Sequence, residues 1–595
     1  MDSGDTRIEK HSLQRIRVFY ALLLVVFSVF ALRLFYLQVI KHNDYKQAAR
    51  NDQFREYEVD ADRGTIYAEL NGKTVPLVVN QKLFTVYADP SIIKKPTETA
   101  AKVAPVIKEN ESAVRELLEL KERRYVILKK RVDAGTVKKL LSLKLPGVGA
   151  QERNYRAYPQ GTLASQVLGF VNDDGVGKYG LEQALNPVLA GKKGQLKAVT
   201  DVHGVPLASN QDNILVEPVA GQGVTLTLDI GMQTQVEQII KKAQENFKAK
   251  TVSAVVLETQ TGAVKAMANY PTFDPAAYDK VEDGEVFQNA SVTEPIEPGS
   301  IAKVISVAAA LNENAVEPFT PYNDPGHYTF DGARIINVAE GYGSGAQTVS
   351  TMLNKSLNTG AVWVMMQMGG KGQTKITPKA RETLYKYYHD SYRLDQETGI
   401  EQGYEEAGTL IPPEDKDNGI AITYANMAFG QAFTASALQM GAALSAIVNG
   451  GNYYQPHLVA SKALVSGETE KTPLKVLRKN VVSDRTSKDM IHLLDINTKD
   501  HIARWPYMKF QDGYVVGGKT GTAQIPSPTG GYEDALFHGT FMGFVGGDTP
   551  EYTIVVYAYE PKNYTGHAGS QVGQPIFADI AHMLIDNYGV TPKSK

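Results

Sequence analysis

The chain has 595 residues, 43% of them hydrophobic and 21% charged, and its 62 basic and 65 acidic residues give a formal net charge of −3. Since one domain takes roughly 150 residues, several folded units are expected. The composition excludes a disordered chain, and the balanced charge argues against nucleic acid as a partner. The absence of cysteine excludes thiol catalysis and iron–sulfur clusters, and the 11 histidines show no metal-site spacing, so no metal or cofactor is expected.

The first predicted element is an apolar run from Val18 to Ile40, interrupted only by Arg33 and Gln38. At about 1.5 Å of rise per residue, such a helix crosses a hydrocarbon core of roughly 30 Å. No small-x-small cleavage site follows it, which favours an uncleaved anchor over a signal peptide. Basic residues before the run predict that residues 1–17 are a cytoplasmic tail. We therefore expect a single-pass protein of the plasma membrane whose remaining residues lie outside the cytoplasm.

Two domains are predicted after the anchor. Residues 44–215 combine strand-like segments, such as Leu77–Ala88, with charged helices, such as Glu109–Lys121. A turn-rich stretch, Asn210–Gly223, marks a domain boundary. The second domain is expected to occupy residues 224–590.

The second domain begins with a strand, a helix and a hairpin. Val224–Leu228 alternates in hydrophobicity like a half-buried strand, and Asp229 is placed to cap the helix that follows. Val252–Leu257 and Ala263–Ala268 have the pattern of a two-stranded hairpin, and a last helix is predicted from Pro575 to Tyr588. This order of elements indicates an α+β domain.

The segment Glu297–Val304 contains the first chemically informative residues. Ser300 precedes the apolar run Ile301–Asn312, so it falls at the start of a buried helix, and Lys303 lies on the same helix face. A serine hydroxyl needs a base to act as a nucleophile, and a lysine can serve if burial or a second cation lowers its pKa. The same spacing recurs at Ser91, but no long apolar helix follows there.

Two further segments matter only in combination with the first. Ser356–Asn358 offers a second hydroxyl and an amide, although by itself it is typical of a polar helix-to-loop junction. Lys519–Thr522 is a strand pattern interrupted by glycine, which is typical either of a bulge or of a backbone approaching closely, such as an extended peptide along a sheet edge. Ser-x-x-Lys, Ser-x-Asn and Lys-Thr-Gly in this order are a signature of β-lactamases and penicillin-binding proteins.

With these motifs the chain resembles a class B penicillin-binding protein, a monofunctional peptidoglycan transpeptidase, and most of all the division-specific FtsI type. Three positions depart from the family pattern: Ala68-Glu69 replaces Asp-Arg, and Leu357 stands where a small or polar residue is commoner. The resemblance implies an α+β fold with an N-terminal transmembrane helix, an elongated mixed pedestal domain, and a transpeptidase domain that combines an antiparallel sheet flanked by helices with an all-helical subdomain. Other segments similar to the family are Arg63–Ile66, Tyr87–Pro90, Arg156–Gly161, Gly177–Glu182, Thr398–Ile400 and Phe429–Gln431.

The resemblance also implies a reaction. Ser300 would attack the penultimate D-Ala of a stem pentapeptide and release the terminal D-Ala, and an amine of a neighbouring stem peptide would then resolve the acyl-enzyme. Lys303 is the implied base, and Ser356 with Lys519 the implied proton relay. β-Lactams are expected to acylate the same serine. The implied substrate-binding residues are Asn358 for the stem-peptide amide and Thr520, Gly521 and Thr522 around the terminal carboxylate, with the N–H groups of Ser300 and Thr522 as the oxyanion hole.

Alternatives stay open at this point. An elongation-type transpeptidase would share Ser300, Ser356 and Lys519. A D,D-carboxypeptidase or β-lactamase would differ only in letting water reach the acyl-enzyme, although the pedestal and anchor favour a transpeptidase. From a different class, a β-lactam sensor would need a cytoplasmic effector, for which residues 1–17 leave no room, and an inactive scaffold would have lost a motif. The implied partners are peptidoglycan stem peptides with their lipid-linked precursor polymer, β-lactams, and an FtsW-type glycan polymerase among other division proteins of the membrane.

Overall fold

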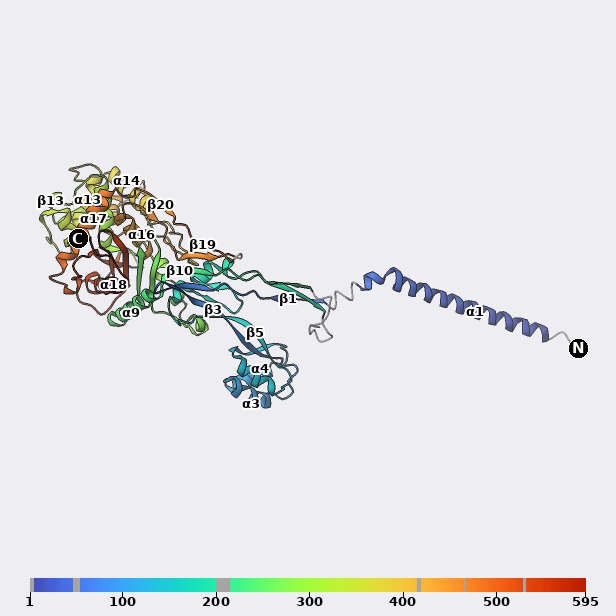
Figure 1. The fold of residues 1–595 in the computed structure, drawn as a ribbon. Helices are drawn as coiled ribbons and strands as arrows, with labels where there is room; N and C mark the ends of the chain where they lie inside the picture. Colours follow the sequence, from blue (N-terminus) through green and yellow to red (C-terminus); the bar gives the residue numbers. More distant parts are fainter. Residues whose placement is uncertain are drawn as a thin grey trace. The chain divides into compact units, whose positions relative to one another are not determined.

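A computed structural model describes residues 5–46, 54–199, 214–414, 419–464, 467–527 and 531–594 (Figure 1). Two compact units make up the chain: unit 1 is Met1–Asp62 with Gly191–Ala220, and unit 2 is Arg63–Ala190 with Gly221–Lys595. Most of the predicted range 44–215 therefore lies in unit 2, together with the range 224–590. Part of the predicted boundary Asn210–Gly223 lies outside the described residues, and the division between the two ranges stays a prediction.

Unit 1 contains the apolar helix and a small sheet. Helix α1 (Asp5–Phe35) continues as a π-helical turn (Tyr36–Ile40), and within it Arg15–Ile40 is long and apolar enough to cross a membrane, with none of it buried against protein. It is the one such helix among the described residues, and it is compatible with the single-pass anchor predicted at Val18–Ile40. The sheet is antiparallel, in the order β1 (Phe54–Val59), β8 (Gly194–Val199), β9 (Ile214–Val216).

Unit 2 contains a mixed sheet that joins segments from both predicted domains. Its order is β19-β18-β10-β2-β3-β4, with β5 also paired to β3, and β10 runs parallel to β2. Three helices pack around a separate small core with β3, β4 and β5. The elements are β2 (Ile66–Leu70), β3 (Lys73–Ala88), α3 (Pro96–Ile107), α4 (Glu111–Glu119), β4 (Val126–Val132), α5 (Ala134–Ser142), β5 (Val148–Ala157), β10 (Val224–Asp229), β18 (Val459–Ala463) and β19 (Thr469–Lys471).

The predicted strand Leu77–Ala88 and helix Glu109–Lys121 are confirmed as β3 and α4. The prediction of a half-buried strand at Val224–Leu228 is wrong in its burial. Strand β10 lies between two neighbours and is largely buried, and Thr227, 8% exposed, donates its hydroxyl to the carbonyl of Val264 at 2.7 Å. A threonine with such a bond is tolerated inside, so alternation in sequence did not mean an exposed face.

A five-stranded antiparallel sheet positions the predicted motifs. Its order is β12-β11-β23-β22-β21, which makes β21 an edge strand. Helices α9 and α18 pack on one face, and α16 and α11 pack on the other. Asp229 caps α9 as predicted, since its carboxylate accepts from the Met232 N–H. The elements are α9 (Ile230–Phe247), β11 (Thr251–Glu258), β12 (Val264–Tyr270), α11 (Ala302–Asn312), α16 (Ala437–Val448), β21 (Val515–Pro526), β22 (Tyr532–Gly546), β23 (Pro550–Tyr559) and α18 (Gln574–Asn587).

The remaining elements complete the α+β fold with a mostly helical region around α11. Their longer helices are α12 (Val349–Lys355), α13 (Asn358–Met368), α14 (Pro378–Lys386), α15 (Ile420–Met427) and α17 (Asp484–His501). The short elements are α6 (Ser165–Leu168), β6 (Phe170–Val171), β7 (Gly177–Lys178), α7 (Gly180–Ala184), α8 (Asn186–Leu189), α10 (Ala290–Thr293), β13 (Pro321–Asp324), β14 (His327–Phe330), β15 (Ala333–Ile336), β16 (Gly345–Thr348), β17 (Tyr453–Tyr454) and β20 (Val476–Arg478).

Candidate active site

Ser300 lies where the sequence predicts, at the beginning of a buried helix. It belongs to a 3₁₀ turn, Gly299–Ile301, that leads directly into α11, and it remains half-buried. Lys303 is 0% exposed, and its Nζ lies 2.8 Å from the Ser300 Oγ. The hydroxyl and the amine are therefore in hydrogen-bond contact, which is the geometry a general base requires.

The second and third motifs meet the first at these atoms. Lys303 Nζ donates to the Ser356 carbonyl at 2.7 Å and to the Asn358 Oδ1 at 2.8 Å, and it lies 3.2 Å from the Ser356 Oγ. The Ser356 Oγ accepts at 2.9 Å from the Nζ of Lys519, which is 1% exposed. A continuous polar chain thus runs from Ser300 through Lys303 and Ser356 to Lys519.

Burial determines the charge of these two amines. It lowers the pKa of Lys303 well below that of an ordinary lysine, and the positive charge of Lys519 lowers it further. Burial also lowers the pKa of Lys519, to about 7. Among the described residues, no carboxylate lies within ion-pair distance of either amine, so nothing negative restores the charge. Lys303 can therefore be a neutral base near neutral pH.

The turn at Ser356 explains how Asn358 reaches Lys303. Ser356 ends α12 in the left-handed conformation, with φ +57°, and Asn358 is the first residue of α13. Leu357 between them is fully buried, and its side chain packs against Gly343. A Cβ at Gly343 would lie 2.4 Å from a Leu357 methyl, so a larger residue there would clash. The unusual leucine in this motif is thus accommodated by a glycine from another loop.

Strand β21 carries Lys519 and lies against the turn that holds Ser300. A Cβ at Gly521 would lie 2.2 Å from the Thr540 Oγ1 and 2.7 Å from the Pro298 carbonyl, so only glycine fits. The close backbone approach expected from the glycines is present, and its partner is this chain's own Pro298. Thr520 and Thr522, on either side, are partly exposed, and the Thr522 Oγ1 accepts from the Gly569 N–H at 3.0 Å.

Glu297 is a residue near the site whose role the sequence analysis missed. Its carboxylate accepts from the Ala432 N–H at 2.8 Å and the Tyr532 hydroxyl at 3.1 Å, and burial raises its pKa. The neighbouring Gly299 N–H donates to the Gly430 carbonyl at 3.0 Å. The signal was an acidic residue directly before Pro-Gly-Ser. Glu297 ties the turn of Ser300 to the loop at Gly430 and to strand β22.

The second Ser-x-x-Lys sequence forms no comparable site. The Ser91 hydroxyl donates to the Asp89 carboxylate at 2.5 Å, and the Ser91 N–H donates to the same oxygen at 3.0 Å, all in an exposed turn. Ser91 therefore stabilises a turn, as the absence of a following apolar helix suggested.

Three segments from the predicted pedestal motifs meet in a buried ion cluster. Glu182 is 0% exposed and accepts from the Nε of Arg63 at 2.6 Å and from the Nε of Arg156 at 2.7 Å. Asn80 joins the two arginines, because its amide donates to the Arg63 carbonyl at 2.5 Å and its oxygen accepts from Arg156 at 2.9 Å. The cluster has no contact with the amines of the candidate site.

Comparison with protein families matches two models. The penicillin binding protein transpeptidase domain matches residues 252–582, and the penicillin-binding protein dimerisation domain matches residues 58–226.

Curated relatives match over nearly the full chain. Stage V sporulation protein D of Bacillus subtilis is 31% identical, over 97% of this chain and 87% of the relative. Penicillin-binding protein PbpB of Mycobacterium tuberculosis is 30% identical, over 96% and 84%. The probable peptidoglycan D,D-transpeptidase PenA of Neisseria gonorrhoeae is 26% identical, over 96% and 92%.

Solved structures agree with these matches. Penicillin-binding protein 3 of Mycobacterium tuberculosis in complex with aztreonam aligns with a TM-score of 0.66 at 25% identity, over 90% of this chain and 98% of that one. Penicillin-binding protein 2X of Streptococcus thermophilus has the same fold, with a TM-score of 0.70 at 22% identity, over 90% and 80%.

Proposed function

We propose that this chain, which belongs to the class B penicillin-binding proteins, cross-links peptidoglycan through a serine acyl-enzyme on Ser300. The chain is a peptidoglycan D,D-transpeptidase with β-lactams as ligands. The observation that supports the serine mechanism most is the 2.8 Å contact between the Ser300 Oγ and the buried amine of Lys303, whose pKa is lowered well below its usual value. These two features are what an activated serine needs.

In the proposed acylation, Lys303 accepts the proton of Ser300 as the oxygen attacks the penultimate D-Ala carbonyl. The oxyanion is held by the N–H groups of Ser300 and Thr522, each worth about 3–4 kcal/mol in such a site. Ser356 gives its proton to the leaving D-Ala nitrogen and is reprotonated from Lys303, which returns to the neutral form. In the second half-reaction an acceptor amine attacks the ester, its proton returns to Ser300 by the same groups, and the new amide is the cross-link.

The remaining site residues are proposed to position the substrate. Asn358 binds the stem-peptide amide, and its Oδ1 contact with Lys303 at 2.8 Å places it next to the reacting hydroxyl. Thr520, Gly521 and Thr522 lie on the edge strand β21, where an extended peptide can pair and where hydroxyls face its terminal carboxylate. Lys519, in its charged form, adds attraction for that carboxylate.

Mass spectrometry tests the proposed nucleophile. A penicillin should add its own mass to the intact protein, and peptide mapping should place the adduct on the segment Glu297–Val304. Ser300→Ala should give no adduct, and Lys303→Ala should give little, because it removes the base. An adduct on Ser91, or equal labelling of Ser300→Ala, would refute the assignment.

We propose that α1 is a membrane anchor with residues 1–17 in the cytoplasm and residues 44–595 outside. The outer part includes the pedestal (44–215) and transpeptidase (224–590) ranges. Protease added to spheroplasts should then digest the protein down to an N-terminal stub. Full protection in spheroplasts, with digestion after lysis, would show the opposite orientation.

We further propose that the chain acts in septal wall synthesis beside an FtsW-type polymerase. A relative from Nephroselmis olivacea named as a peptidoglycan D,D-transpeptidase FtsI homolog, 25% identical over 73% of this chain, supports this setting. A functional fluorescent fusion should concentrate at mid-cell, and depletion should give filaments. Lateral labelling with round cells after depletion would indicate elongation instead, and labelling confined to the developing spore would indicate the setting named for the Bacillus relative.

A further inference from the structure

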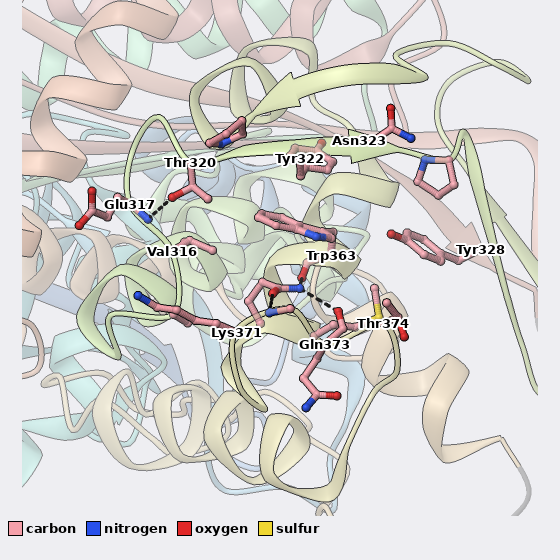
Figure 2. A pocket seen from close by; sticks show the side chains of 16 residues that line it. Val316, Glu317, Thr320, Tyr322, Asn323, Tyr328, Trp363, Lys371, Gln373 and Thr374 are labelled. Carbon is pink, nitrogen blue, oxygen red and sulfur yellow. Dashed lines mark hydrogen bonds between the residues drawn. The ribbon is translucent and has the colours of Figure 1, made fainter.

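A cavity of about 570 Å³ lies in unit 2, and none of the proposed catalytic residues lines it. It is bounded by strand β13, by the second half of helix α13 and by the loop after that helix. Figure 2 shows Trp363 in the middle of the lining, with Lys371 and Tyr328 on opposite sides of it. Its volume is in the range of about 300–1,000 Å³ that is usual for small-ligand sites.

The cavity is preformed rather than a gap between mobile side chains. Tyr322 stacks on one face of the Trp363 indole, with ring centroids 4.4 Å apart and planes 12° apart, which fixes the indole. Gln367 holds the loop after α13, because its amide donates to the Gln373 carbonyl at 3.0 Å and its oxygen accepts from the Gly372 N–H at 2.7 Å. Both walls are thus held without a ligand.

The chemistry of the lining favours a neutral, polyhydroxylated ligand. The charged side chains of the lining are one acid, Glu317, and one base, Lys371, so it offers no field for a polyanion or a polycation. The other features are aromatic faces and neutral hydrogen-bonding groups, which suit a pyranose ring, with its C–H face and its hydroxyls. The aromatic and neutral polar lining residues whose faces or polar groups are not taken up in holding the walls are Tyr328, Trp363, Thr320, Asn323, Gln373 and Thr374.

Helix α13 connects this cavity with the candidate active site. Its first residue, Asn358, contacts Lys303, while Trp363 and Met366 line the cavity. At about 1.5 Å per residue these positions lie about 8–12 Å apart along the helix axis. An extended pentapeptide reaches about 17 Å, so a stem peptide in the active site can remain attached to a sugar in the cavity.

We propose that this cavity binds an amino-sugar segment of a peptidoglycan glycan strand. The occupant follows from three observations together: the balanced charge of the lining, its aromatic faces and its distance from Asn358. The site would hold the strand whose stem peptide is being processed. It goes beyond the proposed serine mechanism and does not depend on which residue is the nucleophile.

The two tryptophans of the chain make the test direct. In full-length protein with Trp505→Phe, in detergent, Trp363 is the only tryptophan, and excitation at the red edge of its absorption avoids the 31 tyrosines. Titration with triacetylchitotriose, a soluble mimic of the glycan backbone, should change its emission in a saturable way. Adding Thr374→Phe, which fills the cavity from an exposed rim position, should reduce this affinity at least tenfold. Adding Lys375→Phe, at the exposed neighbour outside the lining, should leave it unchanged.

Other outcomes would overturn the proposal. These are the absence of a saturable signal, an equal response in the Thr374→Phe variant, or a response to a free stem pentapeptide in place of the sugar. Penicillin labelling of each sample keeps this test separate from the serine mechanism: labelling without sugar binding refutes only the cavity, and sugar binding without labelling refutes only the nucleophile.

Discussion

Unit 2 buries two pairs of basic side chains, and the pairs differ in whether a carboxylate lies between them. Arg63 and Arg156 surround Glu182, at 2.6 and 2.7 Å from Nε to the carboxylate oxygens. Lys303 and Lys519 instead share the hydroxyl of Ser356, at 3.2 and 2.9 Å. Burial is nearly complete in both places, so the surroundings differ mainly in the acid and in the type of base.

Buried positive charge thus serves two purposes in one chain. A guanidinium stays protonated and forms fixed, directional bonds with a carboxylate, so the arginine cluster holds the segment before β2 together with β5 and α7. A buried lysine without an acid lowers its pKa and loses its proton, and it thereby becomes a base. In this account, the candidate site is reactive because its lysines lack the partner that the arginines have.

The strongest test of this comparison places a carboxylate next to Lys303. In Asn358→Asp, a carboxylate of the same shape replaces the oxygen that lies 2.8 Å from Lys303. The negative charge raises the pKa of Lys303 and keeps it protonated, so penicillin acylation at neutral pH should fall about 100- to 10,000-fold, the range of a general base. Labelling kinetics followed by intact mass measure this effect.

The pH profile separates this cause from lost substrate binding. The rising limb of the pH profile is the pH range over which the acylation rate increases. In Asn358→Asp this limb should move to higher pH, because Lys303 must lose its proton next to an added negative charge. In the control Asn358→Ala the rising limb should stay at the wild-type pH, whatever the height of its plateau. A limb that moves equally in both variants would contradict the account.

The reverse experiment removes the carboxylate of Glu182, which lies between Arg63 and Arg156. Glu182→Gln leaves two buried guanidinium groups without a carboxylate, which should lower the free energy of unfolding by about 3 kcal/mol. A lower midpoint in urea measures this, while the folded fraction should still be acylated at the wild-type rate. The matched control is Glu69→Gln, because the half-exposed Glu69 lies 3.9 Å from Lys265 and should change stability by less than about 1 kcal/mol. An unchanged free energy of unfolding in Glu182→Gln would show that the buried arginines do not need this carboxylate, and would contradict the comparison.

The smallest effect is expected at Glu297. This buried carboxylate contacts the Ala432 N–H and the Tyr532 hydroxyl, and neither lysine. Glu297→Gln can keep both bonds through its amide oxygen, so acylation should change by less than about threefold and the rising limb should not move. A displaced limb in this variant would mean that Glu297, rather than the lack of a nearby acid, determines the charge of Lys303.

The sequence predicted local features better than contacts between distant segments. The helix after Ser300, the capping Asp229 and the strand of Lys519 are confirmed because each depends on residues close in the chain. The burial of β10 could not be predicted, since it depends on strands that are distant in sequence. The same holds for the pairing of Leu357 with Gly343.

The two ion clusters show the same limit. The resemblance implied a proton relay of Ser356 and Lys519, but the motifs did not show that the Ser356 hydroxyl lies within hydrogen-bond distance of both amines. The three pedestal segments were recognised separately, and their meeting at Glu182 emerges only from the fold.

The central claim is that Lys303 is a neutral base in the folded protein, and the pH dependence of penicillin acylation tests it most directly. The second-order rate constant, measured by rapid quench and intact mass, reports the free enzyme's ionisations. The account predicts that the rate rises with pH through a limb far below 10.5, the ordinary value for a lysine, and levels off before that pH is approached. A rate that keeps rising to about pH 10.5 would show an unperturbed lysine and would contradict the account.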